Sequence, residues 1–153
     1  SAFRRQEKEW ARAVALLGDI KADPSDHWSL ARIGDHDALC RAMLCMLRTA
    51  VNMTEFYEVR DSMHQKPCGV ETARKKVREL MDIARRELAN AREGCEATKR
   101  NHKIFFSYCY RYEASETMCE HKIRHTEELI SKRLPILCYS EMFSRHRTPE
   151  WPR

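Results

Sequence analysis

Cysteine is the residue type with the widest chemical repertoire in this chain, and it occurs seven times in 153 residues. Such thiols either pack as small apolar side chains or pair as disulfides in an oxidising compartment. Composition leaves both interpretations open, and the odd number leaves at least one thiol free or bonded to a partner. The four cysteines of the C-terminal half are the most informative: Cys95, Cys109, Cys119 and Cys138.

Cys109 and Cys119 flank a predicted turn between two helices. Nine residues separate them, and Thr117 with Glu120 has the spacing of a capping box, which starts a helix. A turn at 113–117 places one thiol about a helical turn before it and the other just after it. Antiparallel helices bring such Cα atoms within the ~4.4–6.8 Å that a disulfide requires. The sequence therefore predicts a disulfide-braced helical hairpin.

Cys95 and Cys138 lie about 18 and 21 residues from the same turn. At ~1.5 Å per helical residue, both are roughly 30 Å from it, which predicts an outer disulfide nested around the first. The alternative is that these thiols are unbonded and packed in a core stripe. No role is assigned to Cys40, Cys45 or Cys68.

Metal binding is a second chemistry that the residues suggest. His121 and His125 are four residues apart, so they share a helix face, and Cys119 is close in the sequence. A zinc site needs a further ligand, and Lys122 stands where a zinc protease has its glutamate. A solvated histidine pair is therefore expected, and no metal or cofactor is predicted.

Catalytic motifs are not evident in the sequence. Cys68, between Pro67 and Gly69, has the best surroundings for a low thiol pKa, but no protease signature accompanies it. The sequence has no phosphate-binding loop and no G-x-G-x-x-G fingerprint. We therefore expect a protein that is not an enzyme and has no small-molecule substrate.

Aromatic residues gather before the predicted turn, with five of them in residues 105–112. Aromatic side chains with basic neighbours can stack on single-stranded RNA, but exposed tyrosine and arginine are also enriched at protein interfaces. We expect contact with a protein. The predicted partner-binding residues are Tyr108, Tyr110, Arg111, Tyr112 and, near the C-terminus, Trp151.

Composition suits long amphipathic helices, because 42% of residues are hydrophobic and 33% charged, with only four glycines and five prolines. No apolar run approaches the ~18 residues of a membrane span. The net charge is +5, and residues 1–70 carry ten basic and ten acidic side chains, so the surplus lies in 71–153. A small surplus interleaved with acids is typical of a solvated helix face, which makes nucleic acid the less expected partner.

Helical periodicity dominates the N-terminal half. A first helix is predicted over 2–17, then a short turn over 25–33, capped by Ser25 and stopped by Gly34. A longer helix follows over 35–63, and two apolar stripes make it the predicted central helix of the bundle. The stripes are Leu39, Met43, Met46, Ala50, Met53 and Tyr57 on one face and Cys40, Leu44, Leu47 and Val51 on another.

The C-terminal half predicts one helix over 71–113, continuous through Gly94, and another that begins after Thr117 and stops before Pro135. The fold class is therefore all-α, with four to five mostly antiparallel helices.

We expect a single helical domain over 1–143. Its N-terminal helices lie in 1–66 and the hairpin in 70–138, and residues 144–153 form an extended arm.

Paired cysteines that flank a helical turn resemble the coiled-coil-helix proteins of the mitochondrial intermembrane space, and most closely the PDSW subunit family of respiratory complex I. In that family a helix leads into a cysteine, a basic residue, a glutamate and then a second cysteine. Here the pattern reads Cys109-Tyr110-Arg111-Tyr112-Glu113 and then Cys119. The cysteines are two residues closer than in the family, Ala114 replaces its glycine, and the resemblance covers about residues 74–130.

The resemblance implies a non-catalytic accessory subunit of a mitochondrial respiratory-chain complex, peripheral to the inner membrane on its intermembrane-space side. Its implied partners are other subunits of that complex. Import by oxidative folding needs no cleaved presequence, which agrees with Glu7 and Glu9 so near the first residue. The alternative is a basic helical protein bound to RNA in an organellar ribosome.

Overall fold

The computed structural model describes residues 2–21, 23–65, 69–100 and 116–137. Its elements are α1 (Ala2–Gly18), α2 (His27–Gln65), α3 (Val70–Arg100), α4 (Glu116–Glu128) and a π-helical segment η1 (Leu129–Arg133), which continues as helix through Leu137. The described residues contain no β-strand, so the predicted all-α class is confirmed for them. Residues 101–115 and the arm predicted over 144–153 lie outside the described residues.

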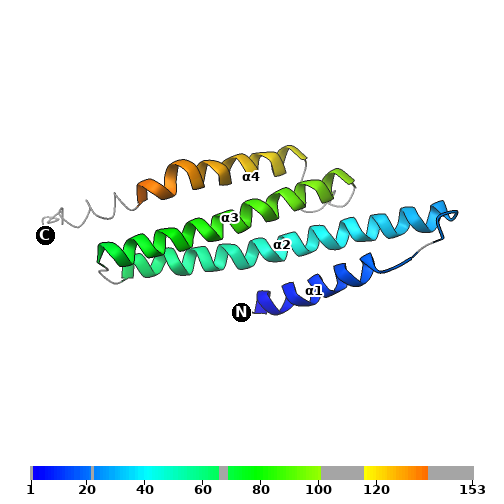
Figure 1. The fold of residues 1–153 in the computed structure, drawn as a ribbon, viewed down its shortest axis with the longest axis horizontal. Coiled ribbons are helices and arrows are strands. Elements are labelled where there is room, and N and C mark those ends of the chain that lie inside the picture. Colours follow the sequence, from blue (N-terminus) through cyan, green and yellow to red (C-terminus); the bar gives the residue numbers. More distant parts are fainter. Residues whose placement is uncertain (1, 22, 66–68, 101–115, 138–153) are drawn as a thin grey trace, which may run out of the picture.

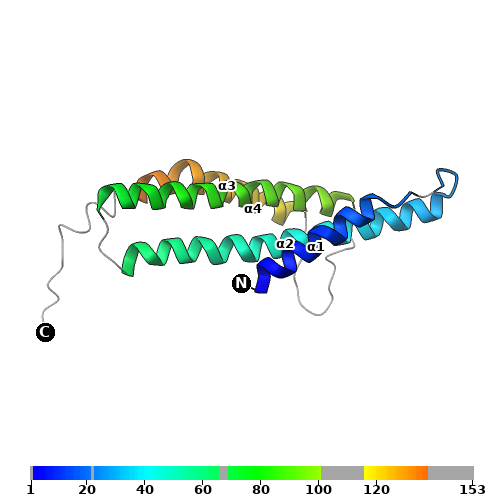
Figure 2. The ribbon, with the colours of Figure 1, turned by 60° about the horizontal axis from the view of Figure 1, so that its bottom comes forward.

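The helices form an elongated bundle in which α2 and α3 lie side by side (Figure 1). Helix α1 packs on α2, and α4 packs on α3. Ion pairs join Arg92 to Glu127 and Lys99 to Glu116, so α3 and α4 run in opposite directions. The connection between α1 and α2 lies beyond the ends of α3 and α4 in both views (Figures 1 and 2).

The core lies where α2, α3 and the end of the α4–η1 helix meet. Leu80 of α3 has no exposed surface, and it packs with Val77, Ala84, Met63 of α2 and Leu134. These α3 residues recur at intervals of three and four, which places them on one helix face. Six further side chains cover the cluster: Phe56, Val59, Met81, Leu129, Ile130 and Leu137.

Gly94 lets α3 approach α2 closely. A Cβ atom at this position would lie 3.4 Å from Cβ and 3.7 Å from Sγ of Cys45 on α2, at the short limit of van der Waals contact. Helix α3 continues through Gly94, as the sequence predicts.

Asp26 caps the start of α2. Its Oδ1 accepts a hydrogen bond from the backbone N–H of Ser29 at 3.0 Å, and its Oδ2 accepts one from the Ser29 hydroxyl at 2.6 Å. The prediction that Ser25 is the cap was wrong, because Ser25 bonds back to Asp23. The hydrogen bonds from Ser29 lower the pKa of Asp26 below its ordinary value of 3.8.

This cap predicts a dependence of stability on pH. A lowered pKa in the folded state adds stability above the ordinary pKa, and that stability is lost as the pH falls through the folded value. Asp26→Asn keeps a good capping residue but does not titrate. In thermal unfolding followed by circular dichroism, we expect the Tm of the wild type relative to Asp26→Asn to fall once the pH drops below 3.8. Asp26→Ala should have the lowest Tm of the three at pH 7, and a pH-independent difference between wild type and Asp26→Asn would contradict the prediction.

The predicted break at Gly34 was wrong, because α2 runs without interruption from His27 to Gln65. A glycine inside a helix costs only about 1 kcal/mol, and no atom lies within 4 Å of where its Cβ would be. Packing of α2 against both α1 and α3 outweighs this cost.

The predicted stop before Pro135 was also wrong. A proline in an α-helix clashes with the carbonyl four residues earlier and donates no hydrogen bond. Here η1 comes just before it, and the N–H of Leu134 bonds the carbonyl of Leu129, five residues back. The wider π-helical turn accommodates the proline, and the chain stays helical to Leu137. At the other end, α4 is already helical at Glu116, so Thr117 lies in its first turn and is not the N-cap.

Candidate protein-interaction surfaces

One apolar stripe of α2 faces outward, and we call it the α2 seam: Leu39, Met43, Met46, Ala50, Met53 and Tyr57. The exposed fractions are 41% for Leu39, 55% for Met46, 48% for Met53 and 45% for Tyr57. Met43 and Ala50 are half-buried. The predicted central position of α2 is therefore only partly correct, because one of its two apolar stripes is open to solvent.

Along the middle of α2, its neighbours α1 and α3 cover other faces of the helix. Leu44 and Val51 of the second stripe are buried. Helix α1 is held to α2 by ion pairs from Glu7 to Arg48 and from Arg4 to Glu55. Helix α3 covers a further side. The seam thus lies on the side of α2 left open by its neighbours.

A small apolar groove adjoins the C-terminal end of the seam. It has a volume of about 220 Å³ and lies between α2, α3 and the α4–η1 helix. Met53 and Tyr57 belong to both the seam and the groove, so the two form one continuous surface. The groove is lined by Asn52, Met53, Phe56, Tyr57, Ile83, Ala84, Glu87, Thr126 and Leu129.

A second apolar surface lies at the connection between α1 and α2, which form a helical hairpin of their own, distinct from the one predicted over 70–138. We call this surface the hairpin tip, and it consists of Leu16, Ile20, Trp28 and Leu30. Their exposed fractions are 67%, 51%, 68% and 41%. The guanidinium of Arg32 lies over the ring of Trp28, 4.5 Å from its centroid, which is a cation–π contact. Sequence analysis missed this surface, although a tryptophan beside a short polar connection was a visible signal.

A buried polar layer joins α2, α3 and α4. Glu87 of α3, whose side chain is only 13% exposed, forms an ion pair with Lys122 of α4. The same carboxylate accepts hydrogen bonds of 2.7 Å from Thr49 and Asn52 of α2. Asn90, one helical turn along α3, donates to the carbonyl oxygen of Cys45 at 2.8 Å. The layer fixes the register of the three helices, since sliding any one of them would leave these groups unpaired.

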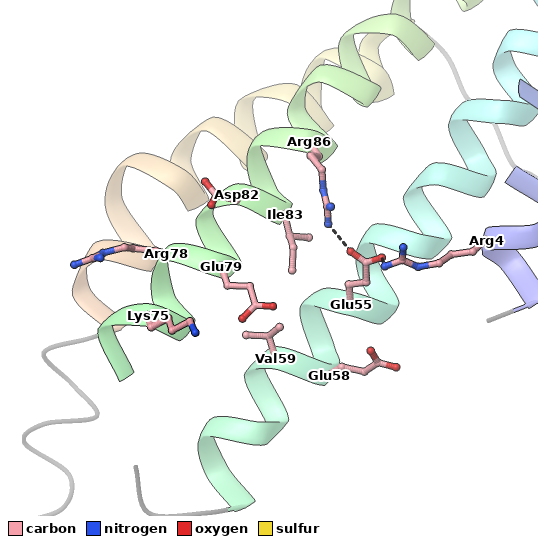
Figure 3. A pocket seen from close by; sticks show the side chains of 10 residues that line it. All are labelled: Arg4, Glu55, Glu58, Val59, Lys75, Arg78, Glu79, Asp82, Ile83 and Arg86. Atoms are coloured by element: carbon pink, nitrogen blue, oxygen red, sulfur yellow. Dashed lines mark hydrogen bonds and ion pairs between the residues drawn. The ribbon is translucent and has the colours of Figure 1, made fainter. Parts of the chain in front are cut away.

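A hollow of about 700 Å³ between α2 and α3 is charged but balanced. Arg4 and Arg86 point toward the carboxylate of Glu55 from α1 and α3 (Figure 3). Four basic and four acidic side chains line the hollow, so it favours neither an anion nor a cation. They are Arg4, Lys75, Arg78 and Arg86 against Glu55, Glu58, Glu79 and Asp82, above Val59 and Ile83.

The predicted disulfides are not seen in the described residues. Cys40, Cys45, Cys95 and Cys119 have free thiols, while Cys109 and Cys138 lie outside the described residues. Cys119 instead lies beside α3, with its Sγ 3.8 Å from Oγ1 of Thr98. Burial raises the pKa of Cys95, and the nearby Cys119 raises it further.

Cys45 should react slowly with alkylating reagents. Its burial, aided by the charge of Glu93, raises its pKa from 9.0 to about 11. Because the thiolate is the nucleophile, we expect iodoacetamide at pH 8 to label Cys45 about 100-fold more slowly in the folded chain than in urea. Pulse labelling with mass spectrometry measures this, with the half-buried Cys119 as the internal comparison. Equal labelling rates for Cys45 and Cys119 in the folded chain would contradict the prediction.

The other sequence-predicted residues fall in different places. His121 and His125 stack on the exposed side of α4, with ring centroids 4.4 Å apart. No group of three or more potential metal ligands occurs in the described part of the chain. The predicted partner-binding residues lie outside the described residues: Tyr108, Tyr110, Arg111, Tyr112 and Trp151.

Within residues 2–21, 23–65, 69–100 and 116–137, none of the helices combines the length and the apolar content that a membrane span requires. Comparison with known proteins gave no match to a family model, to a curated protein or to a solved structure.

Proposed function

We propose that this chain is a non-catalytic accessory protein that braces neighbouring protein subunits. The observation that supports this best is the hairpin tip, where four large apolar side chains are exposed at a projecting end of the bundle. Apolar clusters exposed in this way mark sites of contact with other proteins. Trp28 with its stacked Arg32 combines two of the residue types that dominate binding energy at protein interfaces.

Hydrogen bonds order the part of the tip that leads into α2. Asp23 bonds both the backbone N–H and the hydroxyl of Ser25, and Asp26 caps α2 two residues before Trp28. A preorganised anchor loses little conformational entropy when it binds.

The finer proposal is an accessory subunit of a mitochondrial respiratory-chain complex, peripheral to the inner membrane on the intermembrane-space side. It rests on the resemblance of the sequence around Cys109 and Cys119 to the PDSW family of complex I. Binding to RNA has less support, because exposed basic side chains of α3 pair with acids three residues away. These pairs are Arg74 with Glu71, Arg85 with Asp82 and Lys99 with Glu96.

Native electrophoresis of mitochondrial membranes tests the proposal. A tagged full-length chain should migrate with a respiratory complex, and Trp28→Glu should release it. Lys21→Glu is the matched control, since it changes a charge at the same end of the molecule but keeps all four apolar side chains. Migration with a ribosome, or an unchanged position of Trp28→Glu, would overturn the proposal. Alkylation of all seven thiols in the unreduced complex would contradict the placement in the intermembrane space.

A further inference from the structure

We propose that the α2 seam is the interface of a symmetric homodimer, in which α2 of one chain packs antiparallel against α2 of a second copy. The inference goes beyond the bracing role, because it concerns the purified chain alone and a different surface from the hairpin tip.

The spacing of the seam is that of a coiled coil. Leu39, Met46 and Met53 recur every seven residues, and Met43, Ala50 and Tyr57 form a second series four residues later. Two such series make the narrow apolar stripe by which one helix packs along another. From the first to the last seam residue the stripe extends about 27 Å, at ~1.5 Å per residue. An α-helix is therefore the shape of partner that the seam fits.

An antiparallel register pairs the seam with itself well. It places Leu39 opposite Tyr57, Met43 opposite Met53, and Met46 opposite Ala50, so each layer joins one residue of each series. The smallest side chain then faces a long, flexible methionine, which fills the space beside it. A parallel register would put Ala50 opposite its own copy and leave a cavity, which destabilises a packed interface.

Charge along the middle of the seam does not oppose a second copy. Coiled coils select unlike partners through charged residues that flank the apolar stripe. Between Leu39 and Tyr57 the flanking positions of α2 carry no charge, so two identical copies meet there without repulsion. At the end of the seam the guanidinium of Arg60 lies over the ring of Tyr57, 4.5 Å from its centroid, and the antiparallel register places Arg60 opposite His36 of the other copy. The flanking residues are Cys40, Leu47 and Thr54 on one side and Ala42, Thr49 and Phe56 on the other.

The register is also compatible with the rest of the bundle. Helix α1 approaches α2 at Arg48 and Glu55, away from the seam. The layers are centred near the middle of α2, so the two copies of this helix overlap over residues 31–65. Each hairpin tip then lies at an opposite end of the dimer and stays open to other proteins.

Sedimentation equilibrium of the full chain tests the dimer. In the presence of a reducing agent and up to about 100 µM protein, we expect a mass of twice the 18.1 kDa of one chain. Met46→Glu places a charge in the seam of both copies and should weaken association roughly 100-fold. Leu16→Glu is the matched control, because it adds the same charge at an exposed apolar residue of the tip and should leave the dimer intact.

Mixing two variants tests the register. In the antiparallel dimer residue 46 faces residue 50 of the other copy, so Met46→Glu mixed with Ala50→Lys should form a heterodimer. Met46→Glu mixed with Met46→Lys should do so only if the helices are parallel. Circular dichroism checks that each variant keeps its helix content, and Met53→Glu replaces Met46→Glu if that variant does not.

A monomeric wild type would overturn the dimer and would leave the seam for a helix of another protein or for another part of this chain. A dimer that survives both Met46→Glu and Met53→Glu would show that the interface lies elsewhere. If only the mixture of Met46→Glu with Met46→Lys forms a heterodimer, the antiparallel register is overturned. None of these results bears on migration with a respiratory complex, so the two proposals fail independently.

Discussion

Replacing Leu80 with alanine is expected to lower the free energy of unfolding by about 2–5 kcal/mol. Leu80 has no exposed surface and packs between Met63 of α2 and Leu134 at the end of the α4–η1 helix. The substitution removes buried apolar area and leaves a cavity that three elements line. Since a domain of this size is stable by only about 5–15 kcal/mol, this loss is a large fraction of the total free energy of unfolding.

Urea denaturation followed by circular dichroism measures this loss. Leu16→Ala is the control, because it makes the same chemical change at a side chain that is 67% exposed. We expect it to change the free energy of unfolding by less than about 0.5 kcal/mol. If both variants lose the same stability, Leu80 does not belong to a packed core.

Replacing Glu87 with alanine is expected to cost about 2–4 kcal/mol. The carboxylate is the shared acceptor for Thr49 and Asn52 of α2 and the ion-pair partner of Lys122 of α4. Its removal leaves Asn52, which is 8% exposed, without this partner and uncouples the charge on Lys122. The Glu87 side chain is only 13% exposed, whereas that of Lys122 is 41% exposed, so most of the cost comes from the buried hydrogen-bond donors that lose their acceptor.

Glu87→Gln separates hydrogen bonding from charge. The amide keeps one acceptor oxygen and the shape of the side chain, so we expect a smaller loss than for alanine. Glu96→Ala, at an exposed glutamate of the same helix that is 66% exposed, should change stability by less than about 0.5 kcal/mol. A loss for Glu87→Ala no larger than that of Glu96→Ala would mean that water replaces the polar layer at no cost.

The sequence was sufficient to predict the helices but not all of their ends. The predicted helix over 2–17 matches α1, and the helix predicted from residue 71 matches the start of α3. Local signals failed at Gly34 and Pro135, because both residues weaken an isolated helix by amounts that tertiary packing offsets. At Pro135 the adjustment is a π-helical turn, which propensities do not encode.

Burial was harder to predict than helicity. Helix α2 has apolar residues on most of its circumference, and the sequence cannot state which stripe meets α1 or α3. The Leu44 and Val51 face is buried, whereas the Leu39 and Met46 face is open. The axial alignment of neighbouring helices could not be predicted from the sequence either. It depends on pairs such as Glu87 with Lys122, which lie 35 residues apart. For the same reason, the sequence did not indicate that Cys119 would lie beside Thr98.

The length of α2 has a hydrodynamic consequence. Its 39 residues extend for about 58 Å, so a single chain tumbles and diffuses more slowly than a sphere of equal mass. Gel filtration would therefore overstate the mass of the monomer. Two chains packed side by side along α2 form a dimer that is wider than one chain but almost as long. Dimerisation should therefore reduce the frictional ratio while it doubles the mass.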